Sequence, residues 1–243
     1  MRYAILSDIH ANLDALETVL QDLQGQGVDR VLCLGDFVGY GPEPNECVER
    51  LRPLLHLALV GNHDLAALGR LNPERFNLFA RMAIEWTRQR LSPSVRAYLA
   101  SLSPRAEGEG LLFVHGSPRD PVEEYILDPL TADEIFRSEP FTICFFGHSH
   151  LPMWFLYNGV RTFMRPLPSN VPVRLEEDMR HLVNVGSVGQ PRDGDPRAAY
   201  LIYDAGARMV ELRRLVYPIE AVQRKMRAAE LPRPLWARLA EGR

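Results

Sequence analysis

Two histidines, His148 and His150, follow the apolar run "TICFFG" and are separated by a single serine. Gly147 precedes them, and a glycine can turn the chain so that both imidazoles converge on one point. Imidazole nitrogens are common ligands of divalent transition metals. A lone histidine at a strand end usually has no such role, so the pair predicts a metal site only if other ligands lie nearby.

Polar side chains also follow four other apolar runs, which end in "SDIH", "LGD", "GNHD" and "VHG". Ligands of open α/β sheets collect just beyond the carboxyl ends of the strands, so we expect these side chains to meet at one edge. Five of the seven histidines lie at such positions. The candidate site residues at these ends are Asp8, His10, Asp36, Asn62, His63, Asp64, His115, His148 and His150.

Seven of these side chains form the candidate ligand set: Asp8, His10, Asp36, Asn62, His115, His148 and His150. This number is too large for one ion with room for a substrate, and it fits two divalent ions per chain that share one carboxylate. Oxygen and imidazole donors suit manganese, iron, zinc, cobalt or nickel better than calcium or Cu(I). Two ions roughly 3.5 to 4 Å apart can deprotonate a bridging water and neutralise a tetrahedral oxyanion. The predicted chemistry is phosphoester hydrolysis by a metal-bridging hydroxide.

The hydrophobic pattern predicts the elements that position these residues. The first 64 residues alternate apolar runs with segments of helical spacing, which indicates a βαβαβ start. From about residue 110 strand patterns dominate, and Asn158-Gly159 favours an antiparallel hairpin. Residues 65–105 are predicted to form a helical segment near the active site that shapes substrate access, and residues 218–243 a C-terminal helical tail. Without repeats or linkers, a single domain over residues 1–243 is expected.

Composition excludes several classes of protein. The chain has 243 residues, 46% of them hydrophobic and 24% charged, which is typical of a soluble globular protein. A net charge of −3 offers no basic surface for duplex nucleic acid. The three cysteines form no CxxC pair, which favours buried thiols in a reducing compartment. No apolar run is long enough for a signal peptide or a membrane span, so we expect a cytoplasmic protein without a membrane partner.

The motifs resemble a known family. D-x-H, GD-x-x-x-x-GP, GNHD, VHG and GHSH follow one another over residues 8–150 in the order found in calcineurin-like metallophosphoesterases, with "NVGSVGQPRDGDPRAAY" behind them. The resemblance is to the small bacterial phosphodiesterase- or phosphatase-like branch. It implies an α/β, four-layer αββα sandwich in which two facing mixed β-sheets are flanked by helices, with a dinuclear metal site at one edge.

The resemblance also implies roles for single residues. Asp36 would bridge the two ions, His63 would be the proton donor to the leaving oxygen, and Asp64 would orient His63. One ion would be held by Asp8, His10 and His150, and the other by Asn62, His115 and His148.

Departures from related families narrow the expected substrate. Protein serine/threonine phosphatases of the superfamily carry GDxVDRG and GNHE, whereas this chain has "GDFVGYGP" and "GNHD". A phosphoprotein is therefore a less suitable substrate than a small phosphate ester such as a nucleotide. Many small bacterial relatives have NPGS where this chain has "NVGS", so Val185 replaces a proline.

The segment "GQPRDGDPR" is a candidate substrate-binding loop, since Gly189 and Arg192 could hold a phosphate through backbone N–H groups and a guanidinium fork. A solvated hairpin turn explains the same residues equally well. Tyr40, Tyr125 and Trp154 could stack on a nucleobase, but isolated aromatic residues near strands more often belong to the core.

An alternative to catalysis is a binding scaffold on the same fold, either inactive or with slow turnover, that binds nucleotides or proteins. Loss of ligands would favour that reading. All seven predicted ligands and His63 are present, which favours an enzyme, a metal-dependent phosphatase or phosphodiesterase. Neither the oligomeric state nor the preference between monoesters and diesters follows from the sequence.

Overall fold

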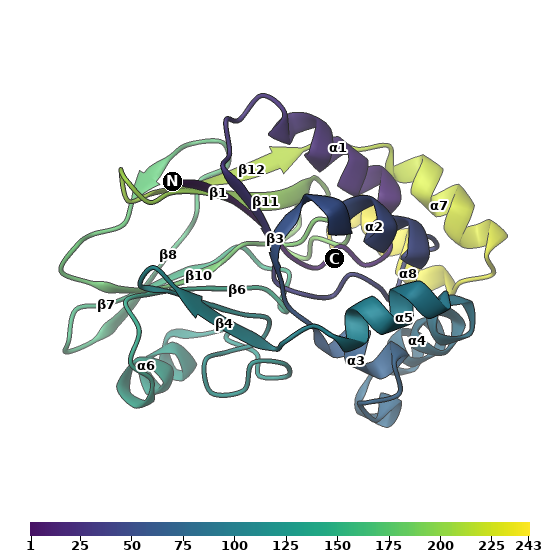
Figure 1. The fold of residues 1–243 in the computed structure, drawn as a ribbon, viewed down its shortest axis with the longest axis horizontal. Helices are drawn as coiled ribbons and strands as arrows, with labels where there is room; N and C mark the ends of the chain where they lie inside the picture. The colour runs from purple at the N-terminus through teal and green to yellow at the C-terminus, as the bar shows by residue number, and fades with distance from the viewer.

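The structure, a computed structural model, describes residues 1–243 and contains two six-stranded mixed sheets (Figure 1). The first has the strand order β3-β2-β1-β11-β12-β9, with bounds β1 Arg2–Leu6, β2 Arg30–Cys33, β3 Leu55–Ala58, β9 Val173–Arg174, β11 Ala198–Asp204 and β12 Met209–Leu215. The second has the order β4-β5-β6-β10-β7-β8, with bounds β4 Arg105–Gly108, β5 Leu111–Val114, β6 Ile143–Phe146, β7 Trp154–Tyr157, β8 Thr162–Arg165 and β10 Arg180–Asn184.

The strand directions follow the sequence pattern. Strands β1, β2 and β3 are parallel, as are β5, β6 and β10, while β7–β8 and β11–β12 are antiparallel hairpins. The predicted turn at Asn158-Gly159 connects β7 to β8, and Gly159 has a φ of 89°, a conformation that favours glycine. Strands β4 and β9 were not predicted. Both lie at sheet edges, and Arg105, Glu107 and Arg174 give them little apolar pattern to detect.

Helices cover the outer faces of both sheets. The first sheet carries α1 (Leu13–Leu23), α2 (Pro44–Leu51), α3 (Asn62–Ala67), α4 (Leu78–Arg90), α5 (Pro93–Ala100), α7 (Ile219–Ala228) and α8 (Arg233–Ala237) on its side, and α6 (Pro129–Ser138) covers the second (Figure 1). The predicted helical segment therefore comprises α4 and α5, and the predicted tail α7 and α8.

Three buried clusters separate the four layers. Tyr3 and Ile5 of β1 meet Phe113 and Phe145 of the second sheet in the central cluster. A second cluster lies between the first sheet and its helices, and a third between the second sheet and α6. The predicted four-layer sandwich of two facing mixed sheets is confirmed. None of the helices combines the length and the hydrophobicity that a membrane-spanning helix needs.

Candidate dinuclear metal centre

The predicted ligands meet where the carboxyl ends of strands from both sheets converge. Asp8 and His10 follow β1, Asp36 follows β2, and Asn62 begins α3 just after β3. His115 follows β5, and His148 and His150 follow β6, as predicted. The seven side chains come from loops far apart in the sequence, yet every one of them is buried.

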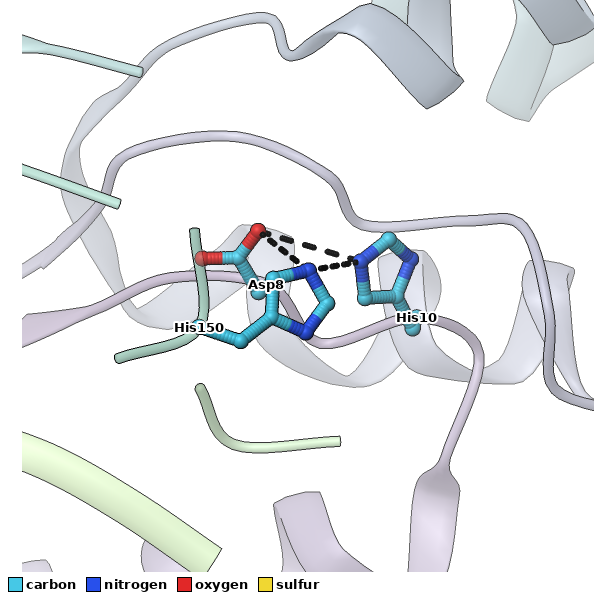
Figure 2. A group of neighbouring side chains, drawn as sticks. All are labelled: Asp8, His10 and His150. Carbon is cyan, nitrogen blue, oxygen red and sulfur yellow. Dashed lines mark hydrogen bonds and ion pairs between the residues drawn. The ribbon is translucent and has the colours of Figure 1, made fainter. Parts of the chain in front are cut away.

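One cluster consists of Asp8, His10 and His150 (Figure 2). The Nε2 atoms of His10 and His150 lie 3.1 Å apart, and Asp8 Oδ1 lies 3.7 Å from the first and 3.3 Å from the second. The other carboxylate oxygen of Asp8 accepts a hydrogen bond from the backbone N–H of His148. The free oxygen and the two nitrogens therefore face one point that could hold an ion.

The second cluster consists of Asp36, His115 and His148. Asp36 Oδ2 lies 3.4 Å from His115 Nε2 and 3.6 Å from His10 Nε2, so this oxygen faces both clusters. Asp36 Oδ1 accepts from the backbone N–H of His63. Asn62 Oδ1 lies 3.1 Å from His115 Nε2, which places it beside the second cluster as well.

Three of the histidines have a tautomer that leaves one ring nitrogen free to bind a cation. Nδ1 of His10, His115 and His150 each faces a backbone carbonyl oxygen, of Val38, Leu34 and Gln190 in that order, at 2.6 to 3.1 Å. Only an N–H can be shared with a carbonyl, so Nε2 of each neutral imidazole keeps its lone pair for a metal.

Two carboxylate oxygens, Asp8 Oδ1 and Asp36 Oδ2, are buried and have no hydrogen-bond partner. Such atoms cost free energy unless something pairs with them. The residues present therefore fit two divalent cations.

Backbone strain accompanies the site. Asp8, His10, Asp36, His148 and His150 all have φ between 48° and 64°, which residues with side chains seldom adopt. This conformation lets side chains that are close in sequence turn toward a common centre.

Gly147 and Gly61 keep space for the ligands. A Cβ on Gly147 would lie 2.0 Å from Ser7 Oγ and 2.7 Å from Asp8 Oδ2. A Cβ on Gly61 would lie 2.1 Å from Asp36 Oδ1. The glycines of "FFGHSH" and "GNHD" are thus required by close approach to two carboxylates.

Burial has the largest single effect on the pKa values of the candidate ligands. It raises the pKa of Asp8 to about 7, with a further contribution from the charge of Asp36. Burial alone would also raise the pKa of Asp36, but the positive charge of His115 lowers it. His115 has a pKa of about 9, because Asp36 outweighs the effect of burial. Two buried carboxylates thus compete for positive charge, which metal ions would supply.

Comparisons with known proteins show which family the chain belongs to. The family model of the calcineurin-like phosphoesterase superfamily domain matches residues 1–208. The chain belongs to the calcineurin-like phosphoesterase superfamily. An uncharacterized protein of Methanocaldococcus jannaschii is 38% identical over 245 residues, covering 99% of this chain and 98% of that protein.

Two solved structures extend the likeness over the whole chain. A metallophosphoesterase from Sphaerobacter thermophilus is 41% identical and has a TM-score of 0.90, with 100% of this chain and 99% of that chain covered. A hypothetical protein from Pyrococcus horikoshii OT3 has a TM-score of 0.80 at 19% identity, with 100% and 98% covered, and shows the fold alone.

In this calcineurin-like phosphoesterase, His63 lies beside the metal ligands. Its ring centre is 4.9 Å from that of His10, 4.4 Å from that of Tyr40 and 4.9 Å from that of Phe76. Its Nδ1 is buried without a partner. Burial, with contributions from the charges of Arg192 and others, lowers its pKa to about 4.

Asp64 forms no hydrogen bond with the His63 ring. Its two carboxylate oxygens accept from the backbone N–H groups of Val38 and Gly61. Asp64 therefore orients the two loops that carry His63 and Asp36, and not the imidazole itself. The end of β10 is tied to the site in a similar way, since Asn184 Nδ2 donates to the Gly147 carbonyl. Val185 N–H donates to Phe146, a bond that a proline would lose.

A pocket of about 180 Å³ opens beside the two clusters in this phosphoesterase. Asn62, His63 and His148 line it, together with Arg192 from the predicted substrate-binding loop. Gly189 has another role: its N–H donates to the Asp8 carbonyl, and a Cβ there would lie 1.9 Å from Ile9 O. Gly189 thus offers no N–H to a phosphate, and close packing is what requires glycine.

The three candidate aromatic residues divide between pocket and core. Tyr40 and Tyr125 line the pocket, and the Tyr125 ring stacks on His148 with centres 3.8 Å apart. Trp154 lies in the central cluster and donates to His181. Sequence reasoning missed six other pocket residues, Arg75, Phe76, Asn77, Ala80, Glu123 and Arg238. Phe76 belongs to no recognisable sequence motif, and Arg238 lies in the C-terminal tail. Nothing in the sequence around either residue therefore indicates that it lines the pocket.

Proposed function

We propose that this protein is a metal-dependent hydrolase of phosphomonoesters or phosphodiesters of small molecules, such as nucleotides. One observation carries the proposal: two buried clusters of carboxylates and imidazoles, with two unpartnered carboxylate oxygens, lie beside a polar pocket that Asn62, His63 and His148 line. When bound, two divalent ions such as manganese would supply Lewis acidity and a water of lowered pKa. The pocket of about 180 Å³ suits a small ester better than a segment of a folded protein.

Each residue of the site has a proposed task. One ion would be held by Asp8, His10 and His150 and the other by Asn62, His115 and His148, with Asp36 between them. His63 faces the pocket and is not needed as a ligand. The negative charge of a bound phosphoryl group would raise its lowered pKa, so His63 would give a proton to the leaving oxygen. Arg192 would hold phosphate oxygens at the rim of the pocket.

The test is an activity screen after removal and return of metal. Chelated protein would be reloaded with manganese, zinc, cobalt, nickel or iron and assayed on p-nitrophenyl phosphate, bis-p-nitrophenyl phosphate and a panel of nucleotides. We expect hydrolysis only with metal, and none in His115→Ala. The matched control is His56→Ala, which removes an exposed histidine outside the site. Stable binding of metal and nucleotide without hydrolysis of any ester would contradict the proposal and favour a binding scaffold.

A further inference from the structure

Two arginines from distant parts of the chain meet beside the metal centre. Arg192 lies in the loop after β10, and Arg238 begins the short helix η3 (Arg238–Glu241) near the C-terminus. Nη2 of each donates to Gln190 Oε1, at 3.0 Å from Arg192 and 2.5 Å from Arg238. Their guanidinium carbons lie 5.6 and 4.8 Å from the centre of the Tyr40 ring. The fold thus holds two like charges close together.

Neither guanidinium forms an ion pair, whereas the nearby Arg214 pairs with Asp193. Nε of Arg192 and Nε of Arg238 are both buried without a hydrogen-bond partner. Burial, and then the charge of Arg192, lowers the pKa of Arg238. Half-buried cations of this kind cost free energy unless an anion compensates them. The fold therefore leaves a place for negative charge.

The place lies in the same pocket as the metal ligands. Arg192 and Arg238 line this pocket together with His63. The Tyr40 ring connects the two regions, since its centre is 4.6 Å from that of His10 and the two guanidiniums lie over the same ring. An anion on the arginines would therefore be a neighbour of a group bound at the metals.

We propose that Arg192 and Arg238 bind a second phosphoryl group of the substrate, next to the phosphoryl group that is hydrolysed. The inference rests on the proposed function and narrows its substrate class to phosphate esters that carry a second phosphoryl group, such as nucleoside diphosphates. In these, water would add to the terminal phosphorus, the P–O–P bond would break and the nucleoside monophosphate would leave. Two guanidinium forks match the charge and the acceptor oxygens of a phosphate dianion. Gln190 and Tyr40 hold the forks in place before the substrate arrives.

The test compares two probes that cannot be hydrolysed, methylphosphonate and methylenediphosphonate, by calorimetric titration of the metal-loaded protein. The wild-type protein should bind the diphosphonate at least about tenfold more tightly than the monophosphonate. Arg238→Gln should weaken diphosphonate binding by about 10- to 100-fold, the range expected for lost charge-assisted hydrogen bonds, and change monophosphonate binding by less than about threefold. Arg233→Gln removes an exposed arginine of the same tail and should change neither affinity.

Two results would overturn the inference. Equal weakening of both probes by Arg238→Gln would assign the arginines to the phosphoryl group at the metals, and no weakening of either would make them structural. Arg192 lies in a separate segment, and Arg192→Gln should also abolish the preference for the diphosphonate. This second variant keeps the test valid if Arg238→Gln fails to fold. The readout needs no turnover. If the protein prefers the diphosphonate but hydrolyses no ester, only the proposed function is contradicted. If it hydrolyses esters but does not prefer the diphosphonate, only this inference is contradicted.

Discussion

His10 and His150 face each other through their Nε2 atoms, 3.1 Å apart, with both Nδ1 atoms turned to backbone carbonyls. Neither Nε2 carries a proton to share, because each proton is on the opposite nitrogen. Two lone pairs at this distance repel each other unless a cation lies between or beside them. The relationship makes metal binding the simplest account of the pair, and Asp8 Oδ1 completes the cluster.

His150→Ala should therefore remove one of about two divalent ions per chain and leave the other, since it deprives only one cluster of a ligand. Elemental analysis of the purified variant measures this directly. His56→Ala, outside the site, should keep both ions. Retention of both ions in His150→Ala would remove this histidine from the ligand set.

Asp36→Asn should weaken the binding of both ions. Asp36 Oδ2 lies within 3.6 Å of histidine nitrogens in both clusters, so an amide there would lower the affinity of each, by about 10- to 100-fold. Metal titration followed by calorimetry gives the two affinities. Asp178→Asn, an exposed change, is the control. Weaker binding of only one ion would show that Asp36 does not bridge the two ions.

His63→Ala should keep both ions but slow hydrolysis of a nucleoside phosphate by roughly 10² to 10⁴, the range of general acid catalysis. A p-nitrophenyl ester should be affected less, because p-nitrophenolate leaves without much help from a proton. The measurement is kcat for both substrates, with metal content checked in parallel. An equal deficit on both substrates, or loss of an ion, would assign His63 to another role.

Phe76→Ala should change the ratio of diester to monoester activity. Phe76 packs edge-on against His63 with ring centres 4.9 Å apart and lines the pocket, so its removal widens the space around the leaving group. We expect the ratio of kcat/KM values to change by about tenfold, the scale of lost apolar contacts in a binding site. Phe79→Ala, an exposed residue of α4, is the control. An unchanged ratio would mean that this segment does not shape access.

Asp22→Asn should destabilise the protein near neutral pH by about 1 to 3 kcal/mol, the worth of hydrogen bonds to a charged group. Burial raises the pKa of Asp22, but hydrogen bonds from Arg213 and Tyr200 outweigh it and bring the pKa below its ordinary value. A lowered carboxyl pKa contributes stability that is present above the unfolded pKa, about 3.9, and is lost as the pH falls through the folded pKa. The difference in unfolding free energy between wild type and variant should therefore shrink below about pH 4, and urea titrations at pH 3 and pH 7 measure it. A constant difference would exclude the ion pair as its cause.

The sequence by itself determined the candidate ligands of this protein, and the four layers followed from the family that its motifs resemble. Each ligand directly follows an apolar strand, so local pattern and strand alternation are enough to place Asp36 or His148 at the common edge. The hairpin at Asn158-Gly159 is local in the same sense. Short-range signals of this kind depend only on residues that are neighbours in the chain, and these can be identified from the sequence.

Only the tertiary structure decided the contacts between segments far apart. Arg238 reaches Gln190 from the C-terminal tail, and no spacing rule connects them. Gly189 looked like part of a phosphate-binding loop, yet its packing against Ile9 involves a residue 180 positions earlier. Asp64 bonds to Val38 rather than to the neighbouring imidazole. In each case the energy depends on a partner brought close by the packing of the two sheets and their helices, and periodicity along the chain carries no information about that partner.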